Sequence, residues 1–227
     1  MQTHLDQELD ELKRTLLTMA SHAETSVQGA VSALLTRNDE LALTVRQNDD
    51  VLDGFEMAVD DSAIRLLAKA PLAGDLRFVT VAMKISQNLE RVGDEAAKIA
   101  KRARDLNREA PLVTQLDFAA MGSLASQMLK GALDAFVRRD PVAARAVIAS
   151  DAAVNALNKQ ARHELEQLMI ASPGNVVRAL NLMIAVKCLE RIADHAKNVA
   201  EEVVYLCEAQ DIRHAEKHPT PATGARN

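Results

Sequence analysis

The chain carries one twelve-residue pattern twice, and the two copies lie about 100 residues apart. Residues 89–100 read LERVGDEAAKIA and residues 189–200 read LERIADHAKNVA, with six of the twelve positions identical. Self-similarity at a fixed period is typical of a duplicated structural unit. The repeat therefore predicts two equivalent units of about 100 residues, and each is long enough to bury a core.

Both units are expected to be helical. Apolar residues make up 48% of the chain, aromatic residues only 2%, and there are 8 glycines, a composition that suits unbroken helices packed through aliphatic side chains. Between positions 5 and 34, leucine, methionine, valine and alanine recur at steps of three and four, which indicates a helix over 4–36. Similar patterns predict further helices from about 39 to before Pro71, from about 75 onwards, and over 113–138, 142–170 and 175–210.

The helices and their short connections predict an all-α fold of two tandem three-helix bundles. The first bundle is expected within residues 1–109 and the second within 110–210, while residues 211–227 lack apolar periodicity and are expected to be a disordered tail. Asp39, Asp140 and Ser172 are the expected helix N-caps, and the last two precede a proline. No segment has the alternation typical of a strand.

The charge balance and the termini exclude several classes of protein. The formal net charge is −5, and residues 1–110 hold 14 basic and 19 acidic side chains, a balance that disfavours nucleic-acid binding. Acidic residues between positions 6 and 11 interrupt any signal-peptide pattern, and no apolar run reaches the ~18–20 residues that span a bilayer. Cys188 and Cys207 should lie about 28 Å apart on one helix, too far for a disulfide. We therefore expect a cytoplasmic protein.

The repeat also places a Glu and an Asp four positions apart in each unit. On a helix such a pair lies one turn apart, and the pair in the first copy points away from the apolar stripe. Counted from the turns at Pro71 and Pro173, acidic or amide residues of the preceding helices fall at matching heights. The candidate ligand sets are Glu90, Asp94, Asp49 and Asp53 in the first unit, and Glu190, Asp194, Asp151 and Asn155 in the second.

A cluster of carboxylates repels itself unless a cation neutralises it. Ligand sets made of oxygen suit hard ions such as Mg, Ca or Mn, and also iron, whereas zinc is disfavoured because the sets lack His and Cys. His195 follows Asp194 but should point aside, and we expect it to be exposed. The alternative is that Asp49, Asp53, Glu56 and Asp60 form a solubilising acidic stripe paired with nearby Arg or Lys.

Arg91 and Arg191 occupy equivalent positions beside these acids. Such residues commonly form weak surface ion pairs, but they could also orient the acidic cluster or bind an anion of a partner protein. The sequence contains no nucleophile–base arrangement and no glycine-rich phosphate loop. We therefore expect no catalytic residues and no enzymatic activity.

The two copies NLERVGDEAAKIA and CLERIADHAKNVAEEVVYL, together with PLAGDLR at 71–77, resemble the PhoU family over about residues 5–210. The resemblance implies two three-helix bundles and a cytoplasmic regulator of phosphate homeostasis, which reaches the membrane through its partners. Those partners would be the ATPase subunit of the phosphate ABC transporter and a phosphate-sensing histidine kinase. With ample phosphate, the regulator would restrain uptake and hold the starvation response off. A homodimer is also expected.

The resemblance further implies that some members bind iron or other metals through the Glu/Asp-x-x-x-Asp pairs. Two departures weaken the second set, because Ala193 stands where the family has glycine and Asn155 replaces a carboxylate. A different class of function also remains, that of a ferritin-like helical protein whose activity is metal storage. Ferritin-like sites place Glu-x-x-His inside a four-helix core, which this sequence does not predict.

Overall fold

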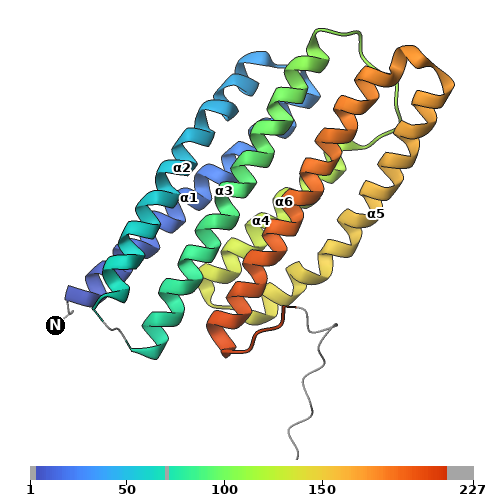
Figure 1. Ribbon diagram of the computed structural model, residues 1–227. Helices are drawn as coiled ribbons and strands as arrows, with labels where there is room; N and C mark the ends of the chain where they lie inside the picture. Colours follow the sequence, from blue (N-terminus) through green and yellow to red (C-terminus); the bar gives the residue numbers. More distant parts are fainter. Residues whose placement is uncertain (1–3, 70–71, 214–227) are drawn as a thin grey trace, which may run out of the picture.

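The computed structural model describes residues 4–69 and 72–213, and these form six long α-helices without a strand (Figure 1). The helices are α1 (His4–Thr36), α2 (Asp39–Leu67), α3 (Ala73–Asn107), α4 (Phe118–Arg138), α5 (Pro141–Ala171) and α6 (Val176–Glu208). A short 3-10 turn, η1 (Pro173–Asn175), precedes α6. The expected all-α fold is confirmed.

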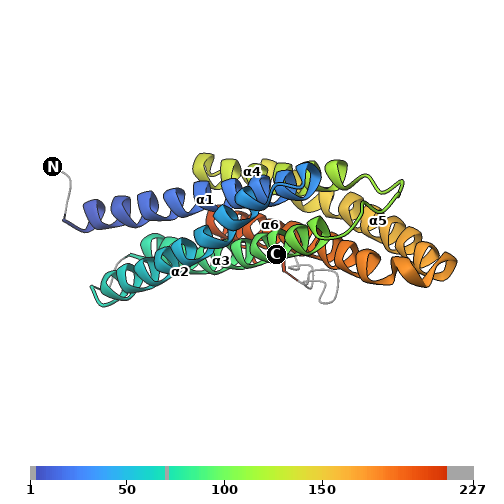
Figure 2. The ribbon, with the colours of Figure 1, turned by 90° about the horizontal axis from the view of Figure 1, so that it is seen from above.

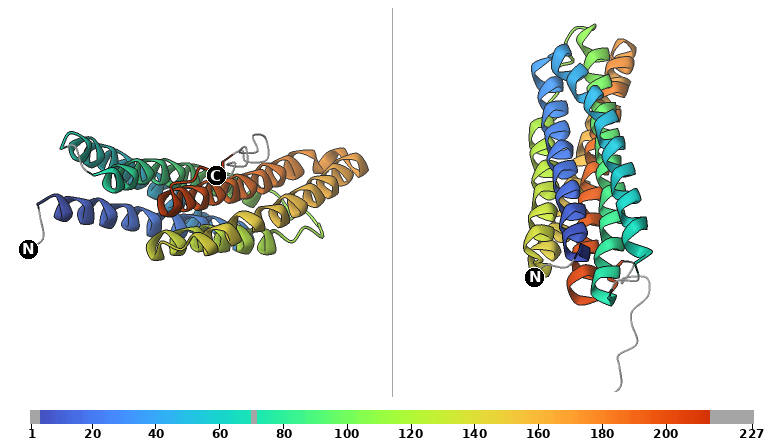
Figure 3. Two further views of the ribbon diagram at one scale, coloured as in Figure 1. Left: turned by 90° about the horizontal axis from the view of Figure 1, so that it is seen from below. Right: turned by 90° about the vertical axis from the view of Figure 1, so that its left-hand side faces the viewer.

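Successive helices run up and down along one common direction, so α1–α3 and α4–α6 form two three-helix bundles side by side (Figures 1 and 2). The long central helices α3 and α6 pack against each other, and α1 contacts α4. Helices α2 and α5 lie at opposite outer edges (Figure 3). The buried side chains of both bundles form one continuous apolar core. The assignment of residues 1–109 and 110–210 to separate domains stays a prediction.

The core is built from small and branched aliphatic side chains, as the composition predicts. Fully buried alanines recur along the central helices, for example Ala96 and Ala100 in α3 and Ala196 and Ala200 in α6. Small side chains let helix backbones approach closely, so α3 and α6 can each pack against several neighbours.

Two of the three expected N-caps need correction. The N-cap of α2 is Asn38 and not Asp39, because the Asn38 side chain accepts a hydrogen bond from the Leu41 N–H at 3.0 Å. Asp140 caps α5 as expected, ahead of a proline in the first turn. Ser172 precedes the turn η1 without a capping side-chain bond, and α6 begins at Val176.

The fourth helix begins at Phe118, five residues later than the expected position 113. The segment before it is not helical, and Glu164 of α5 holds it by accepting hydrogen bonds from the Thr114 hydroxyl and the Gln115 N–H. Asp117 then caps α4 through the Ala120 N–H at 2.8 Å. These side-chain bonds compensate the backbone for the helical hydrogen bonds that it does not make.

No helix in the described part of the chain is long and apolar enough to cross a membrane. Cys188 and Cys207 are both free thiols. The expected disordered tail, residues 211–227, lies outside the described residues except for 211–213.

Candidate functional site: two acidic grooves and the α3–α6 interface

The first acidic groove lies between α2 and α3, and it gathers the acids that the sequence analysis selected there. Asp94 and Asp53 both raise the pKa of Asp49, while Asp94, Glu56 and Asp53 all raise that of Glu90. The acids of the two helices therefore act on one another across the groove. The groove holds one more acid than the predicted set, namely Glu56. It is defined by Asp49, Asp53 and Glu56 of α2 and by Glu90 and Asp94 of α3.

Asp49 is the most perturbed carboxyl group of this groove. Desolvation by burial, followed by repulsion from Asp94 and Asp53, raises its pKa to about 6. The burial follows from the close approach of α2 to α3 at Gly93. A Cβ atom placed on Gly93 would lie 2.3 Å from Leu52 Cδ1 and 3.2 Å from Asp49 Oδ1. The glycine of the repeat thus brings Asp49 against the backbone of α3.

Two cations of α3 partly neutralise the groove. Arg91 lies 3.3 Å from Glu90 and 3.5 Å from Asp94, and Lys98 lies 3.5 Å from Asp94. Arg91 therefore contacts two acids of the cluster, while its role there stays a prediction. Both basic side chains are about half exposed, so their ion pairs contribute little to the free energy of folding.

The first acidic groove has donor groups that suit a hard cation, but they are not arranged as a metal site. All five donors are carboxylates, and burial together with mutual repulsion raises the pKa of Asp49, Glu56 and Glu90, a conflict that a bound cation would relieve. Among the described residues, however, no three His, Cys, Asp or Glu side chains are placed so that they could hold one metal ion. Metal binding stays a prediction.

The second acidic groove lies between α5 and α6 and holds Asp151, Asn155, Glu190 and Asp194. Glu190 and Asp151 raise the pKa of Asp194, after the larger effect of burial. Asp151 is buried, and it accepts hydrogen bonds from Asn155 at 3.0 Å and from Lys197 at 3.1 Å. Lys187 pairs with Glu190. This groove thus has one carboxylate fewer than the four-acid set predicted for the first unit, and it has two lysines.

His195 is half-buried, so the expectation that it is exposed was wrong. It lies on the side of α6 that meets α3, where its Nδ1 is 3.0 Å from Asn88 Oδ1. Burial lowers the pKa of His195, and Arg91, Arg191 and Lys98 act in the same direction against the opposing effect of Glu95. The apolar spacing of α6 indicates a single buried face, so the second face, which meets the other bundle, was not predicted.

Glu95 occupies the position in α3 that His195 occupies in α6, and the sequence analysis missed it. It is only 4% exposed. One carboxylate oxygen, Oε1, lies 3.0 Å from Lys98 and 3.2 Å from Arg191 of the other bundle. Arg191 therefore joins the two bundles, and it also feels the charge of Glu190 in the second acidic groove. Burial, and next the bond to Glu95, raises the pKa of the neighbouring Cys188 thiol to about 12, so this thiol stays protonated.

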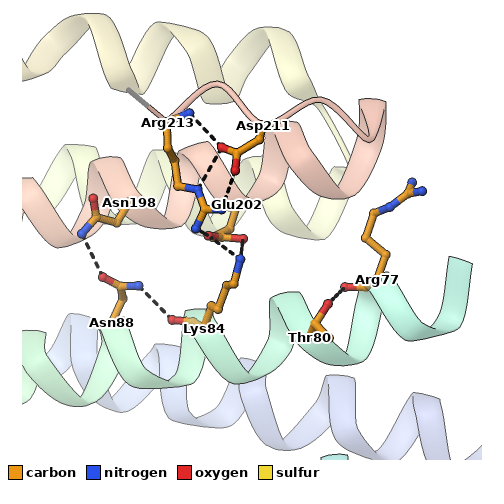
Figure 4. A network of polar contacts seen from close by, with 8 residues as sticks. All are labelled: Arg77, Thr80, Lys84, Asn88, Asn198, Glu202, Asp211 and Arg213. Carbon is orange, nitrogen blue, oxygen red and sulfur yellow. Dashed lines mark hydrogen bonds and ion pairs between the residues drawn. The ribbon is translucent and has the colours of Figure 1, made fainter. Parts of the chain in front are cut away.

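A second buried acid, Glu202 of α6, organises the lower end of the α3–α6 interface (Figure 4). Its carboxylate forms ion pairs with Lys84 of α3 at 3.1 Å and with Arg213 at 3.0 Å. Asp211 pairs in turn with Arg213, so the chain after α6 is held against the bundle. The Tyr205 ring lies 5.5 Å from the Lys84 ammonium group. An acidic residue within an apolar stripe is the signal that could have pointed to Glu202.

Comparisons with known proteins follow the two bundles closely. A family model described as the PhoU domain matches the chain twice, over residues 16–103 and 118–203. The chain is 39% identical over 209 residues to a Pseudomonas aeruginosa protein named phosphate-specific transport system accessory protein PhoU homolog, covering 91% of this chain and 86% of that protein. It is also 30% identical over 210 residues to the phosphate-specific transport system accessory protein PhoU of Escherichia coli strain K12. That match covers 91% of this chain and 86% of the Escherichia coli protein.

Two crystal structures have the same architecture. One is PhoU from Pseudomonas aeruginosa, with a TM-score of 0.89 and 37% identity over 91% of this chain and 100% of that one. The other is the phosphate transport system regulatory protein PhoU from Streptococcus pneumoniae, with a TM-score of 0.85 and 27% identity over 92% and 99% of the two chains. Both the sequence and the fold therefore match over nearly the whole length, and the chain belongs to the PhoU family.

Proposed function

We propose that this protein is a non-enzymatic regulator of phosphate transport and of phosphate-starvation signalling. The observation that carries the proposal is the double match to the PhoU domain model. Relatives that are 30–39% identical over about nine-tenths of the chain are named as accessory proteins of a phosphate-specific transport system. The chain covers 86% of each of these two relatives, so the match extends over both of their repeats and not over one alone.

We further propose where the protein acts, which partners it binds and that its effect on starvation genes is repression. The protein works in the cytoplasm, reaches the membrane through its partners and acts as a homodimer. It binds the ATPase subunit of the phosphate ABC transporter and a phosphate-sensing histidine kinase, and it represses starvation genes when phosphate is plentiful. The exposed arginines Arg91 and Arg191 are already paired with acids of this chain, which makes them weaker candidates for binding a partner's anion.

The test is a reporter of phosphate-starvation genes in a deletion strain grown with ample phosphate. We expect the reporter to be active without the protein and silent again when the wild-type protein is restored. A pull-down with the purified transporter ATPase checks the partner separately. A reporter that stays silent in the deletion strain would contradict the proposed repression.

We also propose that the first acidic groove binds a hard cation such as Mg, Mn or iron. Asp49, Asp53, Glu90 and Asp94 would hold it, and the ion would supply the positive charge that crowded carboxylates need. The substitutions Glu90→Ala and Asp94→Ala together should lower the metal content of the purified protein. Neither side chain is part of the apolar core, although Glu90 is only 14% exposed, so helicity should be nearly unchanged. Elemental analysis and far-UV circular dichroism measure the two effects, with Glu166→Ala on α5 as the control.

The alternative function is metal storage by surface carboxylates. The position of the acids in surface grooves, and their pairing with Arg91 and Lys98, disfavour it, because ferritin-like sites lie inside a four-helix core. Redox turnover of bound iron by a protein that does not bind the transporter ATPase would favour storage over regulation.

A further inference from the structure

The outer face of α2 carries apolar side chains that no part of the described chain covers. Among the helices that the structure describes, α2 packs against α1 and α3 alone, and its other side faces away from both bundles (Figures 2 and 3). Met57 is 65% exposed and Ile64 is 61% exposed, with Leu43 and Val51 near 40%. Gly54 and Ala58 lie between them and are also exposed. We call Leu43, Val51, Gly54, Met57, Ala58 and Ile64 the outer α2 face.

The sister helix α5 shows that the fold does not require these apolar residues. Positions correspond at an offset of 102, because the buried Leu52, Val59 and Ala63 of α2 match the buried Val154, Ala161 and Leu165 of α5. At three of the exposed positions the apolar character is lost. Leu43, Met57 and Ile64 are matched by Arg145, Lys159 and Glu166. The same structural role is thus filled in α5 by charged residues, so the fold itself does not account for the large apolar side chains of the outer α2 face.

Gly54 is a second feature of the outer α2 face that the fold does not explain. A glycine inside an exposed helix costs about 1 kcal/mol relative to alanine. A Cβ atom at Gly54 would meet nothing within 4 Å, so the packing of this chain gives no reason for the glycine. It leaves room for the backbone of another helix to approach closely.

The charges around the outer α2 face indicate the charge of a complementary partner. Helix α2 contains eight acidic and two basic residues, whereas α5 contains three of each. Asp50 and Asp61 are exposed among the apolar side chains, and neither forms an ion pair with any described residue. Two copies of such an acidic face would repel each other, so a second copy of this chain is a poor occupant. A helix with basic residues is complementary.

We propose that the outer α2 face binds an amphipathic helix of another protein. The apolar side of that helix lies over Val51, Gly54 and Met57, and its Lys or Arg side chains meet Asp50 and Asp61. Docking of an amphipathic helix on an exposed apolar strip is a common mode of recognition. The proposal goes beyond the proposed function, because it assigns a surface and a partner chemistry whichever protein supplies the helix.

A labelled synthetic peptide helix tests the proposal against the whole protein. The probe has leucines along one side and lysines beside them, and its twin carries glutamates in place of the lysines. We expect the lysine peptide to bind, by fluorescence anisotropy, at least roughly tenfold more tightly than its twin. Exchanging two residues for those of α5, Met57→Lys with Ile64→Glu, should weaken that binding by roughly tenfold or more, since each removes one large apolar contact.

The matched control is Val142→Lys with Ile170→Glu, which removes two equally exposed apolar side chains from α5 and should leave binding unchanged. Gly54→Ala should raise the melting temperature and still weaken binding. Equal binding of both peptides, unchanged binding by the Met57/Ile64 variant, or no binding at all would overturn the proposal. A wild-type dimer that the same variant dissociates in sedimentation would also overturn it, because the occupant would then be a second copy. The reporter test of the proposed function is independent of all these outcomes.

Discussion

Ionised Asp49 lowers the stability of the folded protein, because it is crowded by other acids in the first acidic groove. Burial against α3 and repulsion from Asp94 and Asp53 raise its pKa from 3.8 to about 6. The folded protein therefore binds this proton more tightly than the unfolded chain does. The resulting cost to stability is absent at low pH, grows as the pH rises from about 4, and is complete above about 6.

Replacing this carboxylate by an amide should stabilise the protein at neutral pH. We expect Asp49→Asn to raise the free energy of unfolding by about 1 kcal/mol at pH 8, after allowance for solvent screening, and to have little effect at pH 4. Urea denaturation in the presence of EDTA measures both values. The exposed neighbour Asp50→Asn is the control. A gain of equal size at pH 4 would show that the effect is not electrostatic.

His195 gives the opposite dependence on pH. Its pKa is lowered mainly by burial in the α3–α6 interface, so the folded state favours the neutral ring and loses stability as the pH falls through the ordinary range of histidine. His195→Gln keeps a donor for Asn88 and removes the titration. We expect its urea midpoint to fall less between pH 7 and pH 5 than that of the wild type. His163→Gln, on the exposed side of α5, should behave like the wild type.

At the scale of the element, the glycines Gly54 of α2 and Gly93 of α3 have opposite surroundings. Gly93 faces the fully buried Leu52, while Gly54 faces open space. The sister helix α6 has Ala193 where α3 has Gly93, so the second unit lacks a glycine at this particular contact.

Adding one methyl group at each glycine should separate these two situations. Gly93→Ala should destabilise the protein by about 1–3 kcal/mol, because α2 must move away from α3 to make room. Gly54→Ala should stabilise it by up to about 1 kcal/mol through helix propensity alone. Thermal and urea unfolding measure both changes. A stable Gly93→Ala variant with an unaltered Asp49 titration would contradict the close contact described for the groove.

Helix periodicity predicted all six helices but not every boundary. Apolar spacing reports the buried stripe of a helix, so α1 and α2 were located within a few residues. It does not report a side chain that arrives from another helix, which is why the hold of Glu164 on residues 114 and 115 was missed and α4 was placed too early. The heights of Asp49 and Asp94 could be predicted because antiparallel helices joined by a short turn fix them. The roles of Glu95, His195 and Glu202 could not, since the packing of α3 on α6 is absent from any local pattern.

At the scale of the whole molecule, the α3–α6 interface makes one body of the two bundles. Its apolar core is continuous, and Arg191 reaches Glu95 across it while Lys84 reaches Glu202. Buried ion pairs of this kind add little net stability, but breaking one leaves an uncompensated charge. The interface is thus specific as well as extensive.

A shared core should unfold in one step. We expect a single calorimetric transition in the intact chain, with calorimetric and van't Hoff enthalpies equal within error. Glu202→Gln should lower its midpoint without splitting it. Two resolved transitions would instead show that residues 1–109 and 110–210 are independent domains.

The even number of alternating helices has a practical consequence. Helix α1 begins and α6 ends at the same end of the molecule, while residues 108–117 join the bundles at the opposite end (Figure 1). The chain could therefore be closed between its present ends and reopened in that connection. Such a circular permutant would place α4–α6 before α1–α3 and keep every interhelical contact. The order in which the duplicated halves are synthesised is thus free to vary, while their mutual fit is not.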